Sequence, residues 1–202
     1  MQDAAADGVI DETERASLDA LRADRGAIAN RFIDMGGKSA TGNTHVAKGP
    51  GVHRSAPFRA GLKRLFGLGL SFDAWVFHHQ LAEVTELARA FPDGNIVLCH
   101  MGGVLGYGRH AGKKDEIFAQ WKAAMTELAR CPNVSVKVGG LMMRLAAIDY
   151  LDMPAPPTSQ QLADAWRPYA GTCLELFGAE RCMVESNFPV DKMGIGYAGL
   201  FN

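Results

Sequence analysis

Three short apolar runs in the second half of the chain each lead into side chains that can take part in chemistry. The side chains that follow these runs are His100, then Lys137, and then the group Glu185, Ser186 and Asn187. An imidazole exchanges protons near neutral pH, and an ammonium group stabilises developing negative charge. Because the C-terminal ends of successive parallel strands converge on one face of a β/α barrel, this pattern predicts an enzyme active site.

The elements that must position these side chains alternate between short apolar strands and longer amphipathic helices. The expected strands lie at 71–77, 95–99, 134–138 and 181–184. The expected helices lie at 58–65, 81–91, 117–128 and 159–177. Upstream, the sequence predicts a helix at 11–25, a short strand at 27–33 and a long loop at 35–51. Since only crossover connections join parallel neighbours, the alternation indicates an α/β fold with a parallel sheet.

Length and composition narrow the class of protein. The 202 residues include 21 basic and 22 acidic side chains, and 48% of the residues are hydrophobic, which suits one domain with a buried core. Without a basic block, neither a nucleic acid nor a membrane is an expected partner, and a small-molecule substrate fits better. No apolar stretch reaches the roughly 18 residues of a membrane span and the acidic start is unlike a signal peptide, so the expected location is cytoplasmic. The four cysteines lack disulfide or zinc spacing and are expected to be reduced thiols in the core.

Five segments, taken in order, resemble the amidohydrolase-related (amidohydrolase 2) family of metal-dependent TIM-barrel hydrolases. These segments are 58–62, 70–75, 96–103, 133–141 and 181–191. Within the family, the chain is most similar to the sugar-lactone and pyrone dicarboxylate lactonases, with the aminocarboxymuconate semialdehyde decarboxylases as more distant relatives. The resemblance implies a (β/α)8 barrel of which about strands four to eight are present, in a single domain over 1–202 that is truncated at both ends. The open strand edges of such a piece predict either poor stability or association, for example as a homo-oligomer.

The resemblance also implies a divalent metal, zinc or manganese, but two features of this sequence argue against it. Family members hold the metal with a His-x-His pair on the first strand, and this chain contains no His-x-His. Most members have Asp at the position of Asn187, and an amide is neither a charged ligand nor a general base. The metal ligands are therefore left unassigned, and the substitution indicates weak metal binding or a metal-independent site.

The resemblance assigns acid–base work or substrate polarisation to His100, and the residues themselves suggest the other roles. His100, Asn187 and Asp191 are the expected catalytic residues, and either Asp191, which closely follows Asn187, or a group on the missing segment is expected to activate water. The alternative for Asp191 is a loop cap or a partner of Lys192. The expected substrate-binding residues are Lys137, His78, Trp75 and Glu185. Lys137 either binds a substrate carbonyl or carboxylate or pairs with Glu185.

The remaining histidines are expected to play smaller parts. His78 and His79 follow the strand predicted at 71–77, in the region where the resemblance to the decarboxylases places another metal-binding histidine. Adjacent residues on a strand point to opposite sides, so one of the two is expected to face substrate and they are not expected to ligate one ion together. His45, His53 and His110 are interpreted as loop residues rather than ligands.

These features favour a hydrolase that opens a lactone or another cyclic ester by attack of an activated water molecule. One alternative is a lyase that removes carboxylate from an unsaturated acid, which release of carbon dioxide would reveal. Another is a non-catalytic barrel remnant, favoured by the absent His-x-His and by Asn187. A remnant would show no turnover and no stabilisation by zinc or manganese.

Overall fold

Four parallel strands form one sheet in strictly sequential order. The computed structural model describes residues 52–106, 110–142, 157–193 and 195–201. The strands are β1 (Phe72–Ala74), β2 (Ile96–Leu98), β3 (Val134–Val138) and β4 (Cys182–Val184), paired β1-β2-β3-β4. The α/β class and the parallel sheet predicted from the alternation are confirmed. The elements predicted at 11–25, 27–33 and 35–51 lie outside the described residues.

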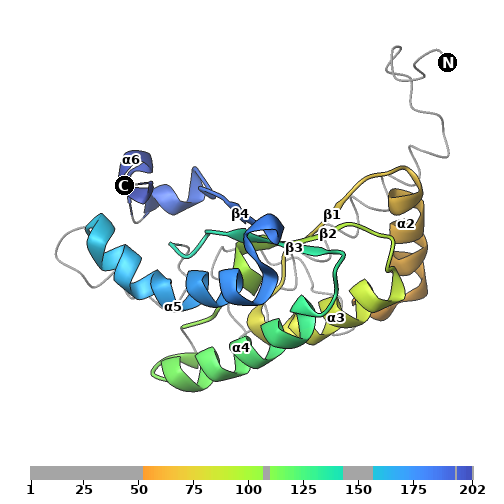
Figure 1. Ribbon diagram of the computed structural model, residues 1–202, viewed down its shortest axis with the longest axis horizontal. Coiled ribbons are helices and arrows are strands. Elements are labelled where there is room, and N and C mark those ends of the chain that lie inside the picture. Colours follow the sequence, from red (N-terminus) through yellow and green to blue (C-terminus); the bar gives the residue numbers. More distant parts are fainter. Residues whose placement is uncertain (1–51, 107–109, 143–156, 194, 202) are drawn as a thin grey trace, which may run out of the picture.

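Helices connect successive strands and cover one face of the sheet (Figure 1). The α-helices are α2 (Ala56–Gly67), α3 (Leu81–Ala90), α4 (Lys114–Ala129), α5 (Ser159–Phe177) and the short α6 (Tyr197–Leu200). Short 3-10 helices flank the strands: η2 (Val52–Arg54), η3 (His78–Gln80), η4 (Cys99–Gly102), η6 (Ala179–Arg181) and η7 (Val190–Met193). Helix α3 packs against α4, and α4 packs against α5, so these helices form one layer.

The helix boundaries follow from local capping chemistry. The Ser55 side chain accepts a hydrogen bond from the Phe58 backbone at the start of α2. At the start of α5, Thr158 and Gln161 form a capping box, in which each side chain satisfies a backbone N–H of the other residue. Helix α5 ends at Gly178, whose positive φ of 76° a glycine adopts without strain.

Alternating positions on the strands separate the core from the opposite face of the sheet. One set of side chains joins the buried core beneath the helices: Phe72, Ala74, Ile96, Leu98, Val134 and Val136. The intervening positions include Asp73, which is 50% exposed, and Lys137, which is 25% exposed. The two-residue period of a strand therefore places packing on one face and charge on the other.

Strand lengths agree with the sequence-based expectation at β3 and differ at β1. Strand β3 spans 134–138 as predicted, whereas β1 ends at Ala74 rather than at position 77. Ala74 is paired with Leu98, after which β2 turns into η4, so pairing stops at the same level on both strands. The segment after Ala74 bends into η3, which changes the directions of the His78 and His79 side chains.

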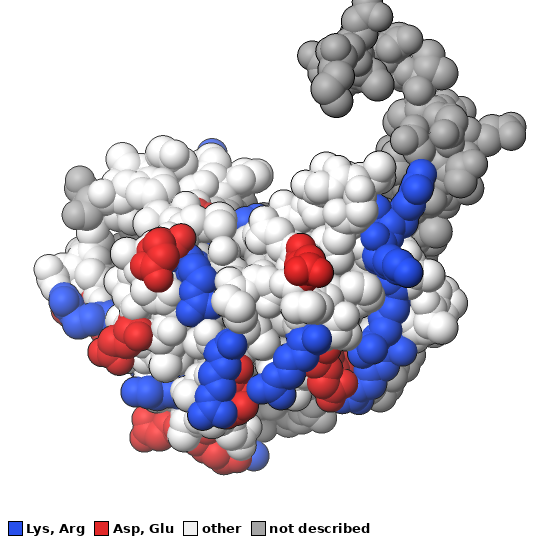
Figure 2. Space-filling view, turned by 45° about the vertical axis from the view of Figure 1, so that its right-hand side comes forward, with Lys and Arg blue, Asp and Glu red and all other residues white. Residues whose placement is uncertain are grey.

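The charged surface is mixed. On the face shown in Figure 2, acidic side chains lie among the basic ones. Ion pairs link neighbouring helical elements, with Arg54 bonded to Glu86 and Arg89 bonded to Glu127. No helix in the described part of the chain combines the length and apolar character that crossing a membrane requires. Among the described residues, Cys99, Cys131, Cys173 and Cys182 are free thiols, as the sequence predicts.

Candidate active site at the C-terminal ends of the strands

The C-terminal ends of the four strands bring together most of the side chains singled out from the sequence. Trp75 follows β1, His100 follows β2, and Glu185 and Asn187 follow β4. The Trp75 and His100 rings meet edge to face with centroids 5.3 Å apart. Because neighbouring parallel strands end at the same level, residues far apart in the sequence converge there.

His100 and Glu185 form a carboxylate–imidazole pair across 85 residues of sequence. The Nδ1 atom of His100 lies 2.5 Å from Oε1 of Glu185, and the His100 backbone N–H donates to the same oxygen at 3.2 Å. Their side chains are 10% and 16% exposed, so the pair is largely shielded and still reachable from solvent. A carboxylate at Nδ1 orients the ring and leaves Nε2 to exchange protons.

The backbone around this pair adopts conformations that side chains other than glycine rarely occupy. The φ angles of His100, Met101 and Asn187 are 54°, 50° and 46°. Such left-handed residues cost free energy and persist where the surrounding contacts hold them. One such contact is the bond of 2.7 Å from Trp121 Nε1 to the Met101 carbonyl beneath the turn. The backbone conformations that place His100 and Asn187 at the strand ends therefore lower the stability of the fold.

Two glycines after β3 make room for the pair. A Cβ atom at Gly139 would collide with Glu185, and one at Gly140, whose φ is 72°, would collide with the His100 ring. Only glycine allows this close approach of the backbone to both side chains. The glycine pair is a part of the site whose purpose the sequence alone did not reveal.

Asn187 is bonded to Asp191, which is buried. Asn187 Nδ2 donates to Asp191 Oδ1 at 2.8 Å, and Asp191 is 1% exposed. Burial raises the pKa of Asp191 to about 6, against the hydrogen bond from Asn187 and the nearby His100, which lower it. Its Oδ2 atom has no hydrogen-bond partner among the described residues. The carboxyl group of Asp191 therefore fixes the orientation of the Asn187 amide.

Lys137 has a different partner from the one considered in the sequence analysis. Its Nζ atom lies 2.6 Å from Asp73 Oδ2, so the alternative in which Lys137 pairs with Glu185 is wrong. The hydrogen bond to Asp73 raises the pKa of Lys137. Glu185 is engaged by His100. Asp73 lies on β1, in register with Val97 of β2 and with Ser135 of β3, so Lys137, two residues beyond Ser135, lies on the same face of the sheet and reaches across β2 to Asp73. Asp73 escaped notice in the sequence although it is a charged residue inside an apolar strand.

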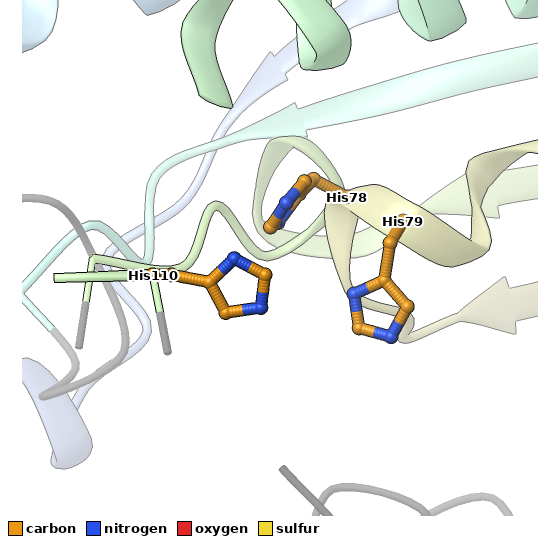
Figure 3. A group of neighbouring side chains, drawn as sticks. All are labelled: His78, His79 and His110. Atoms are coloured by element: carbon orange, nitrogen blue, oxygen red, sulfur yellow. The ribbon is translucent and has the colours of Figure 1, made fainter. Parts of the chain in front are cut away.

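A second group at this end of the sheet consists of His78, His79 and His110 (Figure 3). Each has a ligand-type atom within 4.8 Å of those of the other two. The expectation that His78 and His79 point to opposite sides is wrong, because they lie in η3 and not on a strand. His110, interpreted as a loop residue, joins them from the segment before α4. His53 instead pairs with Glu83 at 2.9 Å, and His45 lies outside the described residues.

A small cavity of about 170 Å³ borders Glu185. Its walls include Met101, Gly139, Trp166 and Val184, which come from three strand ends and from α5. The walls are mainly apolar, so the cavity provides an uncharged surface beside the paired carboxylate.

The residues at the place where the resemblance puts the metal do not fit one. The sequence contains no His-x-His, and the Asn187 amide is bonded to Asp191 in the position of the expected Asp ligand. The donating amide nitrogen is not a metal ligand, and the carbonyl oxygen of Asn187 is uncharged and therefore a weaker ligand than a carboxylate. We therefore derive no catalytic step through a metal at this position.

Comparison with known proteins assigns the family. Residues 4–202 match the amidohydrolase family. The chain belongs to this family. A solved amidohydrolase from Burkholderia multivorans has the same fold in two crystal forms. The form with bound HEPES has a TM-score of 0.61 at 25% identity, covering 73% of this chain and 48% of that one. The form with bound zinc has a TM-score of 0.62 at 21% identity, covering 93% and 68%. The expected barrel-type α/β fold is thus confirmed.

Two curated relatives of the family share more sequence. An uncharacterized protein, y4mH, of Sinorhizobium fredii is 35% identical over 153 residues, which cover 76% of this chain and 45% of that protein. An L-fucono-1,5-lactonase of Burkholderia multivorans is 27% identical over 176 residues, which cover 84% of this chain and 56% of the lactonase. The chain therefore spans about half the length of the curated relatives it matches.

Proposed function

We propose that the chain carries the acid–base part of a hydrolase site that opens a lactone or another cyclic ester. The observation that supports this most strongly is the His100–Glu185 pair, with a distance of 2.5 Å at the ends of β2 and β4. Membership of the amidohydrolase family and similarity to a lactonase point to the same class of reaction.

In the proposed reaction His100 is the catalytic base. A water molecule attacks the carbonyl carbon of the lactone and gives its proton to Nε2 of His100. Glu185 is a positioning residue: it binds Nδ1 and stabilises the positive charge that the ring acquires. This role replaces the sequence-based assignment of the base to Asp191, because that carboxyl is 1% exposed and bonded to Asn187.

Asn187 is suited to hold the developing oxyanion. One N–H of its amide is bonded to Asp191, and a second N–H remains for a substrate oxygen. A fixed donor of this kind stabilises the tetrahedral intermediate, which then breaks the ring C–O bond. The proton on His100 passes to the departing ring oxygen, and the product is a hydroxy acid. Asn187 would thus serve as a donor where most family members have a carboxylate.

Turnover of sugar lactones tests the proposal. The purified chain is incubated with 1,5-lactones, including L-fucono-1,5-lactone, and acid release is followed with a pH indicator and corrected for spontaneous hydrolysis. The variants His100→Gln and Glu185→Gln are expected to lose about 100-fold or more of the turnover. The matched control Glu86→Gln, at an exposed helix position, is expected to retain it.

Several outcomes would contradict the proposal. They are the absence of turnover above the spontaneous rate for every lactone, turnover unchanged in both site variants, and release of carbon dioxide from an unsaturated acid. The last would favour the decarboxylase alternative.

A further inference from the structure

The histidine cluster formed by His78, His79 and His110 has the spacing of a shared metal site. The ring centroids are 5.4 Å apart for His78 and His79 and 5.2 Å apart for His78 and His110. The third pair, His79 and His110, has centroids 6.2 Å apart. Two imidazoles bound to one tetrahedral zinc ion have centroids about 5 Å apart, because each Zn–N bond is about 2.1 Å long. The three rings therefore stand close to ligand positions around a single point.

The histidine cluster is held by its surroundings. The His78 backbone N–H donates to the Gly103 carbonyl at 3.2 Å, and His78 itself is 3% exposed. The η3 turn is capped by Gln80, whose side chain accepts from the Phe77 backbone at 3.1 Å. The His79 ring stacks on Phe77, with centroids 6.0 Å apart. Two of the three rings are thus anchored to the same turn, which lowers the entropic cost of gathering ligands.

We propose that His78, His79 and His110 together bind one divalent transition-metal ion of the zinc type. Three imidazoles favour zinc, cobalt, nickel or copper over magnesium and calcium, which prefer oxygen ligands. Three nitrogen donors leave one tetrahedral position open, as in catalytic zinc sites, whereas structural zinc sites have four protein ligands. None of these three side chains belongs to a His-x-His pair or stands at position 187, so the set of ligands is not the one that the sequence analysis considered. It is also independent of the roles proposed for His100 and Glu185.

Binding the ion requires one existing hydrogen bond to break. The Leu105 backbone N–H donates to Nδ1 of His78 at 3.3 Å, so the ring proton lies on Nε2 in the metal-free protein. Ligation through Nε2 would move the proton to Nδ1, and ligation through Nδ1 would displace the Leu105 N–H directly. Either way the Leu105 amide loses its acceptor. Its NMR resonance is therefore a local reporter of metal binding.

The test measures metal binding without using catalysis. Chain freed of metal by a chelator and of any purification tag is titrated with Zn²⁺ by calorimetry and with Co²⁺ by visible absorption. We expect one ion per chain, a tetrahedral Co²⁺ spectrum, no competition by Mg²⁺, and a shift of the Leu105 amide. His79→Gln and His110→Gln are expected to weaken binding by about 10–100-fold or more, since even the loss of supporting groups has effects of that size.

The matched control is His100→Gln, which removes a histidine at the same end of the sheet but outside the cluster. It is expected to keep the metal affinity while losing lactone turnover, so failure of either proposal is recognised separately. Circular dichroism and thermal unfolding verify that each variant is folded; His79 is exposed, so its replacement is expected to be tolerated. Absence of saturable Zn²⁺ binding, or equal binding by wild type and both cluster variants, would overturn the inference.

Discussion

The polar side chains at the two ends of the sheet have different partners: backbone carbonyls at the N-terminal ends of the strands and other side chains at the C-terminal ends. At the N-terminal ends, Asn133 directly precedes β3 and Arg181 directly precedes β4, and both side chains donate to backbone carbonyls. Arg181 reaches four carbonyl oxygens, those of Ala129, Cys131, Val134 and Phe177. Asn133 reaches three, those of Ala88, Phe91 and Gly94. These side chains tie loops and helix ends together.

At the C-terminal ends the polar groups bond to each other and the backbone is strained. His100 pairs with Glu185, Asn187 pairs with Asp191, and His100 and Asn187 have left-handed backbone angles. Arg181 and Asn133, which do not titrate, stabilise the N-terminal ends of the strands, whereas the titratable groups His100, Glu185 and Asp191 lie at the C-terminal ends. The fold thus keeps stabilising donors at the N-terminal ends of the strands and the candidate catalytic groups at the C-terminal ends, as β/α barrels do.

The largest effect expected at the stabilising end is that of Arg181→Met. Loss of the guanidinium leaves several carbonyls without a donor, so we expect a loss of about 3 kcal/mol in the free energy of unfolding. Urea denaturation measures it. The control Arg89→Met removes an exposed ion pair with Glu127 and should cost less than about 1 kcal/mol. Equal losses in the two variants would show that Arg181 stabilises the fold no more than an exposed ion pair does.

At the chemical end, Asp191→Asn should change the pH dependence of stability. The pKa of Asp191 in the folded chain is about 6, above its ordinary value of 3.8. Below the pKa of the unfolded chain Asp191 is protonated in both states, and the folded chain has its full stability. This stability is lost as the pH rises through the pKa of the folded chain, because the buried carboxyl group must then ionise. The variant does not ionise, so it should gain stability relative to wild type by about 1–3 kcal/mol between about pH 4 and pH 8. A difference that stays constant with pH would contradict this.

A pair of glycine variants tests whether His100 depends on the close approach of the backbone at Gly140. Gly140 and Gly112 have nearly the same φ, 72° and 73°, but a Cβ atom meets His100 at the first and nothing within 4 Å at the second. Gly140→Ala should therefore destabilise the chain by about 1–2 kcal/mol more than Gly112→Ala, and it alone should lower lactone turnover. Thermal unfolding and the turnover assay measure the two effects. Similar behaviour of both variants would show that His100 does not depend on this close approach.

The smallest effect is expected for the ion pair on the open face of the sheet. Lys137 and Asp73 are 25% and 50% exposed, so solvent screens their attraction. Lys137→Met should change the free energy of unfolding by less than about 1 kcal/mol, and added salt should reduce the difference. A large loss that persists in high salt would mean that the pair belongs to the stabilising framework instead.

The order of strands and helices was predictable from the sequence because its signals are local. The alternation of short apolar runs with amphipathic stretches, the capping box at Thr158 and the glycine at 178 act over a few residues each. The limits of β3 were right for that reason. The predicted end of β1 was wrong by three residues. The apolar run continues to position 77, but pairing with β2 stops at Ala74.

The residues of the candidate site were predictable from the sequence, but their hydrogen-bond and ion-pair partners were not. His100, Asn187 and Glu185 were found because each follows an apolar strand. Their partners depended on distances that local patterns do not encode. Lys137 pairs with Asp73, 64 positions away in the sequence, and not with Glu185. His110 lies beside His78, 32 positions away.

The periodicity of the sequence was enough to predict an α/β chain with reactive side chains at successive strand ends, because strand and helix periods depend on neighbouring residues. The amidohydrolase family came from the resemblance of five ordered segments. Only the tertiary structure decided which carboxylate holds His100, how deeply Asp191 is buried and that three histidines meet. The physical reason is that hydrogen bonds, desolvation and shared ligation depend on distances across the sheet. Parallel pairing of strands sets those distances, together with the left-handed turns at 100 and 187.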